Sequence, residues 1–304
     1  MKSIQIGGKL AASEIALGCM RISGLGTQQA ARLIGMALDC GIDFFDHADI
    51  YGGGRSEEVF AEALSTMPGA RGKLKLQSKC GIRKGFFDFS KEHILSSVEG
   101  SLKRLKTDRL DALLLHRPDT LMEPEEVAEA FLALERAGKV LHFGVSNQNP
   151  AQMELLSSAV SQPLMINQLQ FSIMHTGMID SGINVNMKSD ASADRDGSVL
   201  EYCRLKGVTI QPWSPFMYGF FEGVFLGNDK FPELNAKIAE LAARYAVPDS
   251  AIAIAWILRH PARMQPIVGT TNPERLRDIC RASEIRLTRQ EWYEVYLAAG
   301  NTLP

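Results

Sequence analysis

Apolar residues recur along the chain in two patterns, as short continuous runs and as longer stretches with one apolar position every three to four residues. The stretch 28–40 has the second pattern, and Gly41 follows it as a helix-ending residue. The runs 42–45 and 112–115 have the first pattern, which is typical of strands buried on both faces. The chain is therefore predicted to alternate strands with helices.

This alternation predicts eight strand and helix units after a small opening hairpin, whose turn is Gly7-Gly8 between 3–6 and a strand that starts at Lys9-Leu10. The expected strands are 16–20, 42–45, 74–78, 112–115, 140–145, 164–168, 208–212 and 264–268. The expected helices are 28–40, 56–65, one from Ser90, 124–138, one from Asn149-Pro150, one near 198–206 and one capped by Asn272 before Pro273. Two further helices, at about 249–260 and 288–297, are expected to pack outside the ring.

Eight strands joined by helical crossovers must be parallel with right-handed connections. A closed barrel and a doubly wound open sheet both satisfy this rule. The barrel is favoured because no linker rich in Pro, Gly or Ser divides the chain. We expect an α/β fold, a (β/α)8 TIM barrel with an N-terminal β-hairpin and two extra helices, as a single domain over 1–304. The polar stretch 178–197 is longer than an ordinary loop and suggests a functional or mobile excursion.

Composition narrows the class of partner. With 45% hydrophobic and 22% charged residues the chain is typical of globular proteins, and 33 Lys+Arg against 35 Asp+Glu give a net charge of −2. That balance argues against a nucleic-acid binder or a polybasic membrane protein and favours a small-molecule partner. The apolar runs are short and MKSIQIGGKL lacks the apolar stretch of a signal peptide, so we expect a cytoplasmic protein, a monomer or weak oligomer, with its five scattered cysteines reduced.

Four ionisable residues follow neighbouring strands, namely Asp46, Tyr51, Lys79 and His116. In a barrel the active site lies at the carboxyl ends of the strands. Polar side chains that follow apolar runs are costly to bury unless they pair with one another. The four are therefore predicted to form one functional site.

The same four residue types fit an acid catalyst. A phenol has a pKa near 10, and a neighbouring ammonium such as Lys79 is expected to lower the pKa of Tyr51. Asp46 would keep Lys79 charged against desolvation, and His116 would donate a hydrogen bond to a substrate oxygen.

Five segments carry a family resemblance, in the order DHADIYGGGRSEEVFAEAL, SKCGI, LLLHRPD, KVLHFGVSN and INQLQFS. Together they resemble the aldo-keto reductases, and within them a bacterial branch of YdhF-like oxidoreductases, from the hairpin to about Arg281. The resemblance implies an eight-stranded barrel that binds NADP(H) without a Rossmann domain and reduces aldehydes and ketones. It also implies that Tyr51 is the proton donor, Lys79 its neighbour, Asp46 the partner of Lys79, and His116 the residue that orients the carbonyl.

The resemblance further implies the residues that hold the cofactor. Ser146, Asn147 and Gln168 would bind the nicotinamide carboxamide, and the Trp213 ring would stack on the nicotinamide. The full implied set is Met20, Asp46, Ser146, Asn147, Gln168, Trp213, Ser214, Pro215, Phe216, Gly269, Thr270, Thr271 and Arg275.

The last part of that set also forms an anion site on physical grounds, because Gly269, Thr270 and Thr271 precede a helix and Arg275 lies one turn inside it. The family uses this segment for the adenosine 2'-phosphate. Many relatives have a lysine at the position of Gly269, so a preference for NADPH over NADH would depend mainly on Arg275 and the two hydroxyls.

Three loops are expected to form the mouth of the pocket, 82–89, 117–123 and 216–226. Their aromatic residues would form an apolar rim suited to aromatic or aliphatic carbonyls, although they could equally pack the loops together. These residues are Phe86, Phe87, Phe89, Phe216, Tyr218, Phe220 and Phe221.

Other functions are weaker interpretations. Gly24-Leu25-Gly26 imitates a dinucleotide-binding fingerprint, but Gln29 occupies the place of the third glycine. A metal-dependent hydrolase would need Asp46, His47, Asp49 and His116 as ligands and has no further histidine at a strand end. Lys79 as a Schiff-base lysine conflicts with the nearby Asp46, which favours the charged amine.

The remaining alternative is a regulatory subunit that binds the cofactor with little turnover, since some members of this family serve channels. We expect an enzyme instead, because no N-terminal extension that could act as a tether precedes the hairpin. Steady NADPH consumption with simple aldehydes would distinguish the two.

Overall fold

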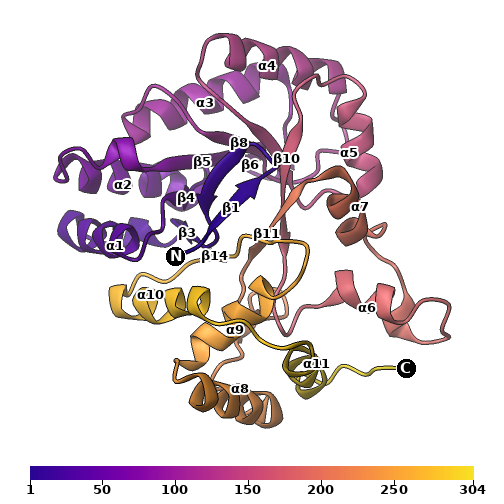
Figure 1. Ribbon diagram of the computed structural model, residues 1–304. Coiled ribbons are helices and arrows are strands. Elements are labelled where there is room, and N and C mark those ends of the chain that lie inside the picture. The colour runs from indigo at the N-terminus through magenta and orange to yellow at the C-terminus, as the bar shows by residue number, and fades with distance from the viewer.

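Eight short parallel strands surround the centre of the molecule in the computed structural model, which describes residues 1–304 (Figure 1). In chain order they are β3 (Ala16–Gly18), β4 (Phe44–Asp46), β5 (Lys75–Cys80), β8 (Ala112–Leu115), β9 (Phe143–Ser146), β10 (Leu164–Gln170), β11 (Thr209–Trp213) and β14 (Ile267–Val268). Each pairs in parallel with its neighbour. At the seam between β11 and β14, the Gln265 amide donates to the Ile210 carbonyl at 3.0 Å, so the sheet is nearly closed into a barrel. The expected (β/α)8 fold class is confirmed.

Helices cover the outside of this sheet because each buries an apolar stripe against it. In α1, for example, Ala30, Leu33, Ile34 and Ala37 are the buried positions. The helices are α1 (Thr27–Asp39), α2 (Arg55–Ser65), α3 (Lys91–Leu105), α4 (Pro124–Arg136), α5 (Pro150–Ser157), α6 (Gly177–Ile183), α7 (Val199–Lys206), α8 (Pro232–Tyr245), α9 (Asp249–Leu258), α10 (Pro273–Cys280) and α11 (Arg289–Ala298). Single 3-10 turns lie at Ile22–Gly24, Tyr51–Gly54, Arg71–Lys73, Asp190–Ser192 and Arg281–Glu284.

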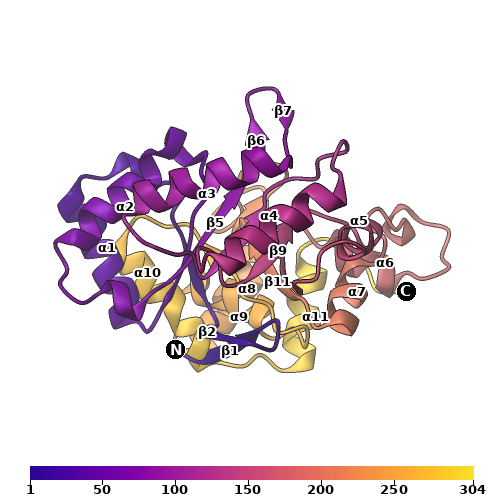
Figure 2. The same cartoon turned by 90° about the horizontal axis from the view of Figure 1, so that it is seen from above.

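The amino end of the barrel is closed by the expected hairpin of β1 (Ser3–Ile6) and β2 (Leu10–Ser13). Its apolar face joins a separate core cluster with residues of the barrel interior, among them Phe44 and Leu114. Two small hairpins follow strands at the other end, β6 (Ile82–Arg83) with β7 (Phe86–Phe87) and β12 (Met217–Tyr218) with β13 (Gly223–Val224). Figure 2 shows the β1–β2 and β6–β7 hairpins at opposite sides of the molecule.

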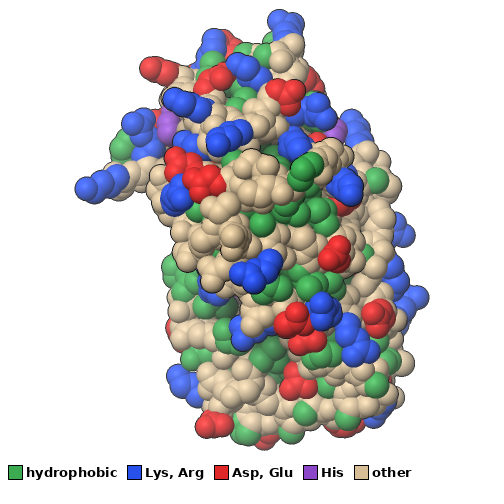
Figure 3. Space-filling model, turned by 90° about the vertical axis from the view of Figure 1, so that its left-hand side faces the viewer, with side chains coloured by type: hydrophobic (Ala, Val, Ile, Leu, Met, Phe, Trp, Pro, Cys, Tyr) green, Lys and Arg blue, Asp and Glu red, His purple; other side chains and the backbone are tan.

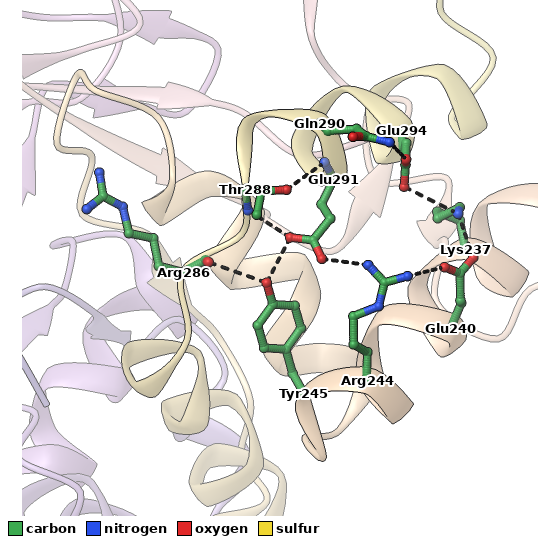
Figure 4. A network of polar contacts seen from close by, with 9 residues as sticks. All are labelled: Lys237, Glu240, Arg244, Tyr245, Arg286, Thr288, Gln290, Glu291 and Glu294. Atoms are coloured by element: carbon green, nitrogen blue, oxygen red, sulfur yellow. Dashed lines mark hydrogen bonds and ion pairs between the residues drawn. The ribbon is translucent and has the colours of Figure 1, made fainter.

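The helices after β11 differ from the sequence prediction. Helix α8, which the sequence analysis missed, precedes α9, and α9 is buried throughout Ala251–Ile257. Placing 249–260 outside the ring was therefore wrong. The outer pair is α8 with α11, joined by charged side chains (Figure 4): Arg244 lies 2.8 Å from Glu291, and the Tyr245 hydroxyl donates to the same carboxylate at 2.8 Å. The polar stretch 178–197 holds most of α6 and a 3-10 turn.

The surface carries mixed charge. Acidic and basic side chains are interspersed over the face drawn in Figure 3, in keeping with the net charge of −2. All five cysteines are free, and four of them are buried. No single helix has the length and apolar composition to span a membrane; only the consecutive helices α8 and α9 pass that test together, and they bend by 92°.

Candidate active site

The four ionisable residues meet at the carboxyl ends of three adjacent strands. Asp46 ends β4, Lys79 lies near the end of β5, and His116 directly follows β8. Tyr51 begins the 3-10 turn between β4 and α2. Since β4, β5 and β8 are neighbours in the sheet, the fold alone brings these side chains together.

Asp46 and Lys79 form a buried ion pair, with Lys79 Nζ 2.6 Å from Asp46 Oδ1. The ammonium also donates to the backbone carbonyl of His47 at 2.6 Å, and Gln77 and Gln168 donate to the same carboxylate oxygen at 2.6 and 3.0 Å. Burial favours the neutral amine, but the charge of Asp46 and the further interactions with Asp46 and Tyr51 together raise the pKa of Lys79. The lysine is therefore an ammonium at neutral pH.

Tyr51 lies beside this ammonium, with Lys79 Nζ 5.0 Å from the centre of its ring. The sequence analysis expected a lowered pKa, and this was wrong for the structure. Burial raises the pKa of Tyr51, and Lys79 only opposes the increase. Tyr51 is therefore a protonated phenol at neutral pH, which is the form that a proton donor requires.

His116 completes the group, and its ring centre lies 5.9 Å from that of Tyr51. Burial, together with the charges of Lys79 and Arg117, lowers its pKa to about 2. The imidazole is therefore neutral, so it can donate one hydrogen bond but carries no charge. Its Nδ1 is buried and has no partner within the protein.

A second buried network, which the sequence analysis missed, holds the turn that carries Tyr51. Gly54 adopts φ +94°, and a Cβ at this position would lie 2.9 Å from Arg104 Cδ. Arg104 Nε lies 2.8 Å from a carboxylate oxygen of Glu57, and the Ser78 hydroxyl donates to the other oxygen at 2.7 Å. This network links α3 and α2 to β5 next to Lys79. Glu57, in the segment RSEEVFAEAL, was the sequence signal that could have indicated this network.

A cavity of about 1000 Å³ runs from Tyr51 and His116 to α10. All the residues that the resemblance implied for cofactor binding line it except Thr271. Lys79 is fully buried and does not itself line the cavity, whereas its neighbours Asp46 and Tyr51 do.

At the inner end of the cavity the implied nicotinamide residues bind one another. Asn147 donates to Ser146 Oγ at 2.7 Å, and the Trp213 indole donates to Asn147 at 3.2 Å. Gln168 donates to Asp46 and, at 3.2 Å, to Gln211. The Trp213 ring is also contacted by Phe221, stacked with 5.8 Å between the ring centres.

At the outer end Gly269, Thr270 and Arg275 line the cavity beside the start of α10. Asn272 caps this helix by accepting from the amides of Glu274 and Arg275 at 2.9 and 3.1 Å. Because the cap uses these two amides, the side chain of Arg275, which is exposed and forms no ion pair, is the main remaining group for an anion. The cavity thus offers amide and hydroxyl groups at one end and a cation at the other, a donor set that fits a nicotinamide dinucleotide with a terminal phosphate.

The rim is only partly as expected. Phe216 and Phe221 line the cavity, together with Ile82, Met217 and Val224. Phe86, Phe87 and Phe220 are exposed outside its lining, and Tyr218 is also outside it. Phe89 is buried and packs on Gly81, where a Cβ would lie 2.2 Å from the ring, so its place on the rim was wrong.

The geometry does not support the metal-dependent hydrolase. Asp46 is bound by Lys79, and the His47 ring is buried edge-on against Phe60 at 4.6 Å. No three His, Cys, Asp or Glu side chains come together in an arrangement that could hold a metal ion.

Fold and site together define a barrel protein with a buried Asp–Lys pair, a tyrosine and a histidine at one end of an elongated cavity. A model of the Aldo/keto reductase family matches residues 14–296. The chain belongs to the aldo/keto reductase family, a family of oxidoreductases.

Relatives match along nearly the whole chain. A 6-dehydroglucose reductase of Agrobacterium fabrum is 36% identical over 98% of this chain and 98% of its own length. Oxidoreductase YdhF of Escherichia coli is 35% identical over 94% and 93% of the two chains. The crystal structure of a thermostable aldo-keto reductase, Tm1743, in complex with the inhibitor epalrestat has the same fold, with a TM-score of 0.78, 24% identity and coverage of 98% and 100%.

Proposed function

We propose that this protein reduces the carbonyl group of a small aldehyde or ketone to an alcohol, with NADPH as the reductant. The observation that carries the proposal is the buried Asp46–Lys79 ion pair beside the protonated Tyr51, at the inner end of a cavity that reaches Arg275. Membership of the aldo/keto reductase family supports it.

Each residue of the site has a defined role in the proposed reaction. NADPH, when bound, supplies the hydride that is added to the carbonyl carbon. Tyr51 donates its hydroxyl proton to the carbonyl oxygen, which balances the hydride and leaves a phenolate. Lys79 stabilises that phenolate by its charge, and Asp46 keeps Lys79 in the charged form. The neutral His116 donates a hydrogen bond to the carbonyl oxygen and thereby orients the substrate.

The cofactor is held at both ends of the cavity. Ser146, Asn147 and Gln168 offer the donors and acceptors that a carboxamide needs, with Trp213 as the aromatic neighbour. Arg275 would bind the 2'-phosphate. Since two relatives carry the name 6-dehydroglucose reductase, 6-dehydroglucose is one substrate to test.

The test of the acid is Tyr51→Phe, which removes the proton donor and keeps the ring. We expect kcat for simple aldehydes, followed by NADPH absorbance, to fall by about 10²- to 10⁴-fold. The dissociation constant for NADPH, measured by fluorescence titration, should stay within about threefold. Near wild-type turnover of the variant would refute Tyr51 as the acid, and a wild-type protein that binds NADPH without consuming it would favour the regulatory subunit.

The test of the phosphate site is Arg275→Met, with Arg277→Met as the control. Both arginines are exposed on α10, but Arg277 is paired with Glu274 at 2.6 Å. We expect the first variant to weaken NADPH by about 10-fold relative to NADH, because a charged hydrogen bond to the 2'-phosphate is lost. The control should leave the ratio unchanged. Equal losses for both cofactors in Arg275→Met would show that the phosphate binds elsewhere.

A further inference from the structure

One cation of the site has no role in the proposed reaction. Arg117 follows His116 at the end of β8 and lines the same cavity. Its guanidinium carbon lies 5.5 Å from the centre of the Trp213 ring, and Tyr51 and His116 line the same cavity. The guanidinium is thus held on an aromatic platform beside the residues that would bind the carbonyl oxygen.

Arg117 has no hydrogen-bond or ion-pair partner in the protein for its side chain, although it is half-buried. Burial lowers its pKa, which means that the site makes the charged form less favourable. Two neighbouring arginines are paired, Arg83 with Asp88 at 2.7 Å and Arg104 with Glu57 at 2.8 Å, whereas Arg21 and Arg275, which also line the cavity, form no ion pair. A guanidinium offers five N–H donors in a rigid fork, and those of Arg117, which lines the cavity, have no partner in the protein.

The acidic residues of the cavity do not neutralise Arg117. Asp46 is bound to Lys79. Asp249, Glu274 and Asp278 come from α9 and α10, the side of the cavity that carries Arg275. None of these carboxylates forms an ion pair with Arg117, so its positive charge is available to a ligand.

We propose that Arg117 binds a carboxylate on the substrate, so that the preferred substrates are aldehydes or ketones that carry a carboxylate on an apolar frame. This inference rests on the proposed reductase function and specifies its substrate class. The planar fork of a guanidinium matches a planar carboxylate through two parallel hydrogen bonds. A single cation suits one carboxylate better than a doubly charged phosphate, and the apolar rim of Ile82, Phe216 and Phe221 suits the frame between the two groups.

The test uses 3- and 4-formylbenzoate and their methyl esters, which have the same frame with and without the charge. In the wild-type protein we expect kcat/KM for at least one acid to exceed that for its ester by about 10-fold or more. In Arg117→Met the ratio of acid to ester should fall by about 10- to 100-fold, and in Arg117→Lys it should be intermediate, because the charge stays and the fork is lost.

The matched control is Arg83→Met, which removes a cation from the β6–β7 hairpin at the same end of the barrel. Its acid-to-ester ratio should stay within about twofold of the wild-type ratio. A wild-type ratio near one for both isomers would overturn the proposal. So would an unchanged ratio in Arg117→Met, an equal fall in the control, or a larger effect of Arg117→Met on the NADPH dissociation constant than on the ratio.

Failure of the reductase function has a different signature, since neither acids nor esters would then be reduced. In that case calorimetric titration of terephthalate into the protein in the presence of NADPH tests Arg117 directly. At least about 10-fold weaker binding to Arg117→Met than to the wild type supports the carboxylate site, and equal binding overturns it.

Discussion

The two ends of the barrel differ in chemistry, because one is closed by apolar side chains and the other holds a buried ion pair. The amino end is closed by the β1–β2 hairpin, whose Ile4 and Ile6 pack into an apolar cluster with Phe44 and Leu114. The carboxyl end holds the Asp46–Lys79 ion pair and opens into the cavity. Burial of each apolar side chain at the first end contributes about 1.5–3 kcal/mol to stability, whereas a buried ion pair contributes little net stability. The amino end therefore contributes more to the stability of the fold, and the carboxyl end holds the groups of the proposed reaction.

A chain of buried glutamine side chains runs through the interior and connects the two ends. Gln77 donates to Asp46 and to Gln211, Gln211 donates to Gln265 at 2.8 Å, and Gln265 donates to the backbone carbonyl of Ser13 in the hairpin at 2.6 Å. Buried amides that bind one another specify one arrangement of the strands around them. The difference between the ends can therefore be tested by substituting residues at each end and measuring both the free energy of unfolding and kcat.

The largest effect is expected at the carboxyl end, from Lys79→Met. The substitution leaves the carboxylate of Asp46 buried without its ion partner, which costs about 3–5 kcal/mol of unfolding free energy. It also removes the charge beside Tyr51, so kcat should fall at least about 100-fold. Urea denaturation and NADPH consumption measure the two effects.

The control is the double variant Asp46→Asn with Lys79→Met, which removes both charges. It should recover part of the lost stability and none of the lost turnover. If Lys79→Met alone unfolds within about 1 kcal/mol of the wild type, the ion pair is not what holds this end together.

The contrast between the ends could largely be predicted from the sequence, because it depends on local signals. The Gly7-Gly8 turn between two short strands indicated the hairpin, and the polar residues that follow apolar runs indicated the site. Asp46, Tyr51, Lys79 and His116 were found together because parallel strands bring their carboxyl ends to one edge whatever the details of packing.

What the sequence could not supply depends on contacts between distant segments. The raised pKa of Tyr51 follows from how deeply its hydroxyl is buried, which no spacing reveals. The unpaired state of Arg117 depends on where the carboxylates of the cavity lie, since Asp46 is bound to Lys79 and the others come from α9 and α10. Helix α8 is a different case: Leu234, Ile238 and Leu241 have helical spacing after Pro232, so the signal was present and was missed.

A smaller effect, and one that depends on pH, is expected for His47, whose backbone carbonyl accepts from Lys79 and whose ring packs against Phe60. Burial, and then the charge of Lys79, lowers the pKa of its imidazole from 6.5 to about 3. The folded state therefore keeps His47 neutral where the unfolded state protonates it, so stability is lost as the pH falls below about 6.5, by about 2 kcal/mol at about pH 5.

The variant His47→Phe keeps a ring against Phe60 and removes the titration. Urea denaturation of both proteins at about pH 7 and about pH 5 should show a smaller loss for the variant. Asp49, whose pKa is raised to about 6, mainly by burial, changes stability in the opposite direction, but it is present in both proteins and cancels in the comparison. Equal losses would show that His47 does not titrate on unfolding.

The smallest effect isolates one contact at the amino end, by comparing Gly7→Ala with Gly8→Ala. Both glycines have positive φ, +53° and +71°, so each substitution costs about 1–2 kcal/mol of backbone strain. A Cβ on Gly7 would also lie 2.6 Å from Cβ of Met165, whereas a Cβ on Gly8 meets nothing within 4 Å. Gly7→Ala should therefore unfold with at least about 1 kcal/mol less free energy than Gly8→Ala, with kcat unchanged in both. Equal stabilities would mean that the hairpin does not close the barrel through Met165, and a lower kcat in Gly7→Ala alone would mean that the glutamine chain transmits strain from one end to the other.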